Sequence, residues 1–158
     1  MAELEKVEEE SLQDEARNTI EEARMVLPGI QALFGFQLIA FFTDRFEELA
    51  PALQNCHLAA LVLVVVSIAL IMAPAAYHRL AERGQVSRHF NDLSSRLIEA
   101  AMLPLMAAVA IEVFVVSYMV TDSFALSITL ALLLLTLLAW WWVVFPYQNR
   151  WRNQVRRT

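Results

Sequence analysis

Four long apolar stretches constrain this chain more than any other feature of its sequence. They cover residues 25–43, 58–77, 97–120 and 123–146, and charged residues are almost absent from them. A helix rises about 1.5 Å per residue, so roughly 20 apolar residues span the ~30 Å hydrocarbon core of a bilayer. The sequence therefore predicts an all-α fold, a bundle of four transmembrane helices.

The composition also favours a membrane protein over a soluble domain. Hydrophobic residues make up 58% of the 158 residues, against roughly 45–50% in a typical soluble domain. The formal net charge of −5 argues against nucleic acid as a partner, because phosphate binding needs a basic surface. Cys56 is the single cysteine, which excludes an internal disulfide and a cysteine-based metal site. We expect no cofactor and no bound metal, and membrane lipids as the surroundings.

Polar segments at both ends divide the chain into three parts. These are an acidic segment, a transmembrane domain and a basic tail, over residues 1–24, 25–147 and 148–158 respectively. In the acidic segment, Leu12, Ala16 and Ile20 recur at a spacing of four, which is a weak helical stripe. Two interpretations remain open: a solvated, partly helical tail, or a helix that packs on the bundle or on a neighbouring subunit.

The positive residues predict the orientation of the chain in the membrane. Eleven of the twelve Lys and Arg residues fall on one side of the predicted spans, and Arg45 falls on the other. Positive residues concentrate in cytoplasmic segments, so we expect both termini in the cytoplasm of an inner-membrane protein. The eleven residues are Lys6, Arg17, Arg24, Arg79, Arg83, Arg88, Arg96, Arg150, Arg152, Arg156 and Arg157.

The two halves of the predicted bundle resemble each other. The stretch from Glu22 to Pro28 resembles the stretch from Glu99 to Pro104, which suggests two tandem helical hairpins related by duplication. Chance similarity is the alternative, because membrane helices use a small set of residue types.

A row of small residues, Ser123, Ser127 and Ala131, lies along the fourth stretch. Such rows let helices approach closely, either within one chain or between subunits. A four-helix monomer has little interior for a conduction path, so we expect a homo-oligomer, and this row is one candidate for its contact.

Glu112 is the most informative polar residue because it lies inside the third apolar stretch. By analogy with Asp, an ionised carboxylate at mid-membrane costs on the order of 2.5–3.5 kcal/mol, and such residues face the protein interior or a water-filled cavity. Gln37, Arg45 and His57 are expected near the same outer half and are candidates for a polar cluster with Glu112. The alternative is a carboxyl group that only joins helices by hydrogen bonding.

A second polar group is expected at the cytoplasmic end of the helices. Its members are Arg24, Gln31, His78, Arg79 and Glu99. The simpler interpretation is that these boundary side chains extend to the lipid headgroups without forming a site.

No soluble-enzyme signature is present in the sequence. It contains no phosphate-binding glycine loop, no HExxH and no GxSxG. We therefore expect no enzymatic activity.

The sequence resembles a family of small bacterial four-helix membrane proteins of unknown function. The resemblance is carried by the stretch from Arg24 to Gln31, by Arg45 with Phe46, and by the stretch from Ala73 to Arg79. It extends from Glu22 to Pro146 and implies the four-helix fold. Some similar proteins are labelled sodium:proton antiporters, which would imply ion exchange.

The favoured function from these observations is passage of protons or small ions through a channel or transporter, with Glu112 as the titrating or ion-binding group. The alternative is a structural or regulatory membrane protein without transport, whose acidic segment binds a partner.

Overall fold

The structure is a computed structural model that describes residues 2–81 and 87–149. The predicted basic tail over 148–158 lies almost entirely outside the described residues, and so do Arg83 and the four arginines of that tail.

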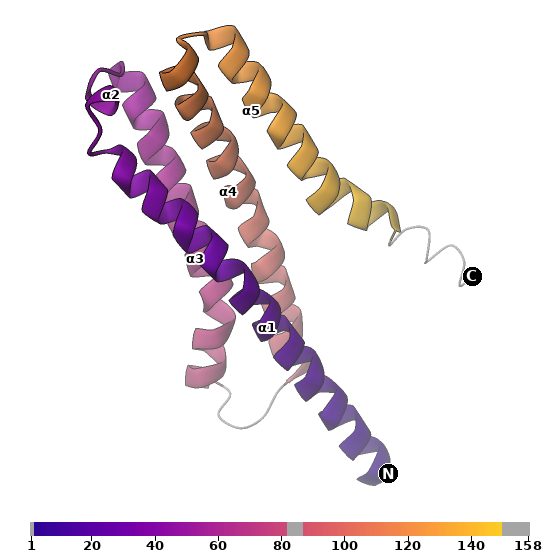
Figure 1. The fold of residues 1–158 in the computed structure, drawn as a ribbon. Coiled ribbons are helices and arrows are strands. Elements are labelled where there is room, and N and C mark those ends of the chain that lie inside the picture. Colours follow the sequence, from indigo (N-terminus) through magenta and orange to yellow (C-terminus); the bar gives the residue numbers. More distant parts are fainter. Residues whose placement is uncertain (1, 82–86, 150–158) are drawn as a thin grey trace. The chain divides into compact units, whose positions relative to one another are not determined.

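The described residues are helical, and no strand occurs among them. In chain order the elements are α1 (Ala2–Ala40), α2 (Asp44–Glu47), α3 (Pro51–Ala81), α4 (Arg88–Thr121) and α5 (Phe124–Ala139), followed by the π-helix η1 (Trp140–Val144) (Figure 1). Four helices are long and apolar enough to cross a membrane, namely Ser11–Ala40, Pro51–Ala81, Arg88–Thr121 and Phe124–Asn149. The prediction of an all-α chain with four apolar helices is therefore confirmed, and the helices are compatible with a membrane protein.

The acidic segment is continuous with the first apolar stretch. Residues 2–24 form the N-terminal part of α1, and the helix passes through Pro28 to Ala40 without a break. Glu, Leu and Ala are good helix formers, which explains the helical conformation of the polar part. Pro28 removes one backbone donor, and membrane helices tolerate this loss when neighbouring groups satisfy the freed carbonyl.

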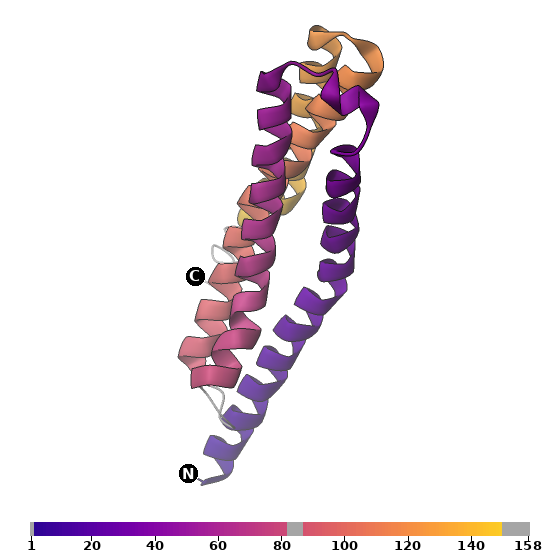
Figure 2. The same ribbon diagram turned by 90° about the vertical axis from the view of Figure 1, so that its left-hand side faces the viewer.

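The helices are divided between two compact units, which are Met1–Leu38 with Val64–Pro104, and Ile39–Leu63 with Leu105–Thr158. In the first unit, the polar part of α1 packs on the start of α4 (Figure 2). The side-chain amide of Asn91 donates to the Leu12 carbonyl at 3.2 Å and to Glu15 Oε2 at 3.1 Å. Ala16 is buried. Of the two interpretations of the acidic segment, the structure agrees with the packed helix.

Side chains at the start of α4 fix its position within the first unit. The Ser87 hydroxyl accepts a hydrogen bond from the Phe90 backbone N–H at 3.1 Å, which satisfies one donor of the first helical turn. Phe90 is fully buried, with its ring centroid 6.1 Å from that of Tyr77 and 5.4 Å from that of His78 on α3. These contacts join the C-terminal end of α3 to the N-terminal end of α4.

In the second unit, a very short turn connects α4 to α5, as the sequence predicted. Asp122 adopts a left-handed backbone conformation with φ 51°, which Asp tolerates better than bulkier residues. Ser123 then caps α5 by accepting a hydrogen bond from the Leu126 N–H at 3.4 Å. The rings of Phe114 and Phe124 pack edge to face across this turn.

Two members of the small-residue row, Ser127 and Ala131, are buried inside the chain, and Ser123 is half-buried. Ser127 is completely buried and Ala131 nearly so, and the Ser127 hydroxyl donates to the Ser123 carbonyl. Ser127 and Ala131 therefore pack within one chain, which is one of the two uses that the sequence left open for this row. Self-association itself stays a prediction.

The fourth span departs from the simple α-helix that its sequence predicted. From Trp140 to Val144 it forms a π-helix, in which the Phe145 N–H donates to the Trp140 carbonyl five residues earlier. Three consecutive tryptophans occupy this turn.

Asn91 is expected to hold the polar part of α1 against α4. In Asn91→Ala both hydrogen bonds are lost, and a net contribution of about 1.5 kcal/mol corresponds to roughly tenfold more frequent opening. Hydrogen–deuterium exchange of the purified protein should show residues 12–24 exchanging about ten times faster. Asp92→Ala, at an exposed neighbouring position, is the matched control. Equal protection in the two variants would contradict this role of Asn91.

Candidate functional site

A histidine and a glutamate form a buried pair in the second unit. His57 Nδ1 of α3 lies 2.9 Å from Glu112 Oε2 of α4, which is hydrogen-bonding distance. The His57 side chain is 1% exposed and that of Glu112 is 12% exposed. Both residues belong to helices that are apolar enough to span a membrane. A polar pair of this kind satisfies two groups that hydrocarbon leaves without a partner.

Two phenylalanines and a backbone contact fix the position of the histidine ring. The Phe41 and Phe46 rings lie edge to face with the imidazole, at centroid distances of 4.8 and 5.1 Å. Phe46 belongs to the short helix α2, which Gln54 of α3 holds in place by donating to the Phe46 carbonyl at 3.1 Å. The aromatic rings therefore cover His57 and limit its exchange with water.

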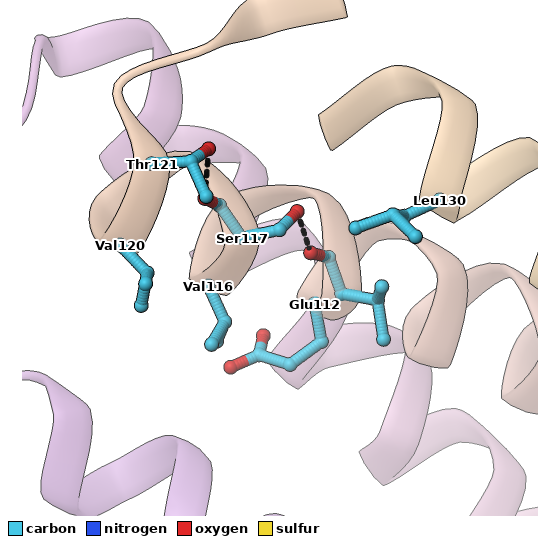
Figure 3. Close-up of a pocket in the computed structure, with 7 residues that line it drawn as sticks. Glu112, Val116, Ser117, Val120, Thr121 and Leu130 are labelled. Atoms are coloured by element: carbon cyan, nitrogen blue, oxygen red, sulfur yellow. Dashed lines mark hydrogen bonds between the residues drawn. The ribbon is translucent and has the colours of Figure 1, made fainter. Parts of the chain in front are cut away.

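Glu112 in contrast borders a cavity of about 420 Å³ along α4. Figure 3 shows the side chains of Glu112, Val116 and Val120 projecting from one side of α4. Leu130 of α5 contributes to the same lining. The Ser117 and Thr121 hydroxyls donate to backbone carbonyls of α4 itself. The cavity therefore extends along α4 from its C-terminal turn to Glu112, and its walls are apolar.

This arrangement can hold a proton without breaking the contact between the two side chains. A neutral or protonated imidazole donates its Nδ1–H to a carboxylate, and a protonated carboxyl group can donate to an unprotonated Nδ1. Each protonation state keeps one hydrogen bond over the same distance, so proton binding requires little movement of either helix.

The same residues are poorly suited to a bare metal cation. Hard cations are held by several oxygen ligands at once. Across residues 2–81 and 87–149, no group of three or more His, Cys, Asp or Glu side chains has the spacing to hold a metal ion.

The two remaining outer candidates, Gln37 and Arg45, differ in their burial. Gln37 of α1 is 1% exposed, so it is an interior residue. Arg45 is exposed on α2, and in the described part of the chain its guanidinium forms no ion pair with Glu112. The structure therefore does not bring the Arg45 side chain to Glu112. Within α2 the adjacent Phe46 turns inward, which leaves Arg45 toward the outside.

The inner candidates also separate into two groups. Arg24 and His78 line one cavity of the first unit, and Arg24 and Arg79 line a second. Gln31 and Glu99 are exposed and line neither of these two cavities.

Sequence reasoning missed several residues that shape the site. Val116 and Val120 follow Glu112 at intervals of four, so helical spacing alone places them on the same face. Phe41 and Phe46 surround His57 because of the loop and the short helix between α1 and α3. No periodic signal in that polar segment predicts those contacts.

Comparison with known proteins identifies a family. The profile of the Family of unknown function (DUF6328) matches residues 5–146. The chain belongs to this family. The match includes the polar part of α1 and all four apolar helices, so the packed N-terminal helix falls within the family region. No curated protein and no solved structure matches this family member.

The hydrogen bond between His57 and Glu112 should contribute measurably to stability. Glu112→Ala removes a partner of a buried nitrogen and leaves a small void, at a cost of about 2–4 kcal/mol. Glu112→Gln keeps an acceptor for His57 Nδ1–H and should cost about 1 kcal/mol or less. Melting temperatures in detergent, followed by circular dichroism, should therefore fall most for Glu112→Ala.

The control for this series is Glu47→Ala, at an exposed position on α2. It should change stability by no more than about 0.5 kcal/mol. A Glu112→Ala protein that melts together with Glu47→Ala would show that the pair adds nothing to the fold.

Proposed function

We propose that this protein binds and releases protons at the His57–Glu112 pair, as part of proton passage across a membrane. The observation that carries the proposal is the buried 2.9 Å contact between two titratable side chains, one of which borders a cavity. A buried ionisable pair inside apolar helices is expensive, and in membrane proteins such groups mark proton and ion pathways.

The division of roles follows from what surrounds each residue. We assign the exchange of protons to Glu112, because it is one of the residues that line the cavity along α4. His57, covered by Phe41 and Phe46, holds the carboxyl group in position and shares the proton. Both side chains of the pair can accept a proton, which supports a proton as the ligand.

The flux experiment uses purified protein in liposomes with a pH-sensitive dye inside. A potassium diffusion potential drives protons inward, and the initial rate of acidification is measured. Glu112→Gln keeps the shape and the hydrogen bond but removes the titratable proton, so flux should fall at least about tenfold. Glu47→Gln removes an exposed carboxylate from α2 and should leave the rate unchanged.

Two outcomes would reject proton passage. One is wild-type flux no greater than that of protein-free liposomes. The other is a Glu112→Gln rate equal to that of the wild type. Either result would favour the alternative of a non-transporting structural or regulatory protein, in which the pair only joins α3 to α4.

The proposal includes an orientation with both termini in the cytoplasm. Its support is the excess of Lys and Arg before the first apolar stretch, between the second and the third, and after the fourth. A reporter fused after Asn55 should be active outside the cytoplasm, and the same reporter fused after Arg150 should be active inside. A cytoplasmic signal from the Asn55 fusion would contradict this topology.

A further inference from the structure

Two adjoining cavities lie in the first unit, where the polar part of α1 meets the C-terminal part of α3. The first, here called the polar cavity, has a volume of about 380 Å³, and its lining includes Arg24 and His78. The second, the apolar cavity, has a volume of about 210 Å³. Ile20 and Arg24 line both cavities, so the two cavities are neighbours along α1.

The lining of the apolar cavity combines apolar side chains with two arginines. Leu27 of α1 and Ile71 and Met72 of α3 provide hydrocarbon walls, whereas Arg24 and Arg79 bring positive charge. In the sequence, Arg24 immediately precedes the first apolar stretch and Arg79 follows the second. These sequence positions predict that the arginines lie near the membrane surface and that the hydrocarbon walls lie deeper. Small side chains, including Ala75, leave the room between the helices.

Carboxylates of the protein neutralise only some of the arginines that line the two cavities. In the polar cavity, Arg17 Nε pairs with Glu21 Oε1 at 3.1 Å. Among the described residues, no carboxylate lies within ion-pair distance of Arg24 or Arg79. Two guanidinium groups beside one cavity repel each other, and an anion between them removes that repulsion. Guanidinium groups bind phosphate oxygens particularly well because their donors match the geometry of the anion.

We propose that the two cavities bind one anionic phospholipid. Its phosphate contacts Arg24 and Arg79, its headgroup extends into the polar cavity, and one acyl chain occupies the apolar cavity. Basic pockets between membrane helices bind anionic headgroups through this combination of charge and apolar surface. A boundary arginine that only extends to the headgroups needs no cavity beside it, so the apolar cavity is the feature that points to a bound lipid.

This site uses neither His57 nor Glu112. A protein that fails to bind lipid here can still conduct protons, and a protein that fails to conduct protons can still bind the lipid. The two proposals therefore succeed or fail separately.

The test is a titration of the purified full-length protein in detergent, with bound ligand counted by native mass spectrometry. Dioctanoyl phosphatidylglycerol is the anionic probe, dioctanoyl phosphatidylcholine the zwitterionic probe, and glycerol 3-phosphate the headgroup without chains. The wild type should bind one phosphatidylglycerol at least about tenfold more tightly than either comparison ligand.

Two variants test separately the contribution of the arginine charges and that of the space for the acyl chain. The double variant Arg24→Gln with Arg79→Gln should lose at least about tenfold in phosphatidylglycerol affinity. Ala75→Leu fills the apolar cavity without changing charge and should also weaken binding of phosphatidylglycerol. Arg96→Gln is the matched control, because Arg96 is an exposed arginine of α4 that lines neither cavity.

Four results would overturn the proposal. The first is unchanged affinity in the double arginine variant, and the second is an equal loss in Arg96→Gln, which would indicate unspecific surface charge. The third is unchanged affinity in Ala75→Leu. The fourth is glycerol 3-phosphate binding as tightly as phosphatidylglycerol, which would identify a site for free phosphate instead of a lipid.

Discussion

Hydrocarbon provides no hydrogen-bond partner, and every polar group inside the four apolar helices is subject to that constraint. Hydroxyl groups meet it locally, since Thr129 and Thr136 donate to carbonyls of α5 one turn earlier. Ser67 meets it between helices, by donating to the Ala101 carbonyl at 3.0 Å. This bond lies one turn before Pro104, where proline weakens the backbone hydrogen bonding of α4. The His57–Glu112 contact meets the same constraint with two titratable groups, and that is why it is the candidate site.

The same physics explains what the sequence predicted and what it did not. Runs of apolar residues are a property of composition along the chain, so the four helices were predictable. The turn at Asp122 was also predictable, because so few polar residues separate two apolar stretches. The acidic segment and the first apolar stretch form one helix, α1, that continues past Pro28. Its polar part is also held by a hydrogen bond to Asn91, which is far away in the sequence. A pattern of neighbouring residues predicts neither feature. The π-helical turn at Trp140 was likewise not predictable, because the apolar residues there show no spacing that distinguishes a π-helix from an α-helix.

The candidate sites were predictable as residue types and only partly as contacts. A glutamate inside an apolar stretch indicates an interior position whatever the fold, and His57 was expected at a similar depth. Which partner Glu112 has depends on the rotation of α3 and α4 about their axes, and α2 decides whether Arg45 or Phe46 turns inward. The arginines at the other end illustrate the same limit. Their positions at the ends of apolar stretches were readable, but the cavities beside them arise from small side chains such as Ala75 on a packed surface.

The short turn at Asp122 also bears on how the chain is made. Contacts between residues close in sequence form early, because little chain entropy is lost in closing the loop between them. Within the second unit, α4 and α5 therefore have the means to pair as soon as both have left the ribosome. The α5 surface is so apolar and so little buried that a delay would leave it exposed to aggregation. Early pairing of the last two helices gives this apolar segment a partner during biosynthesis.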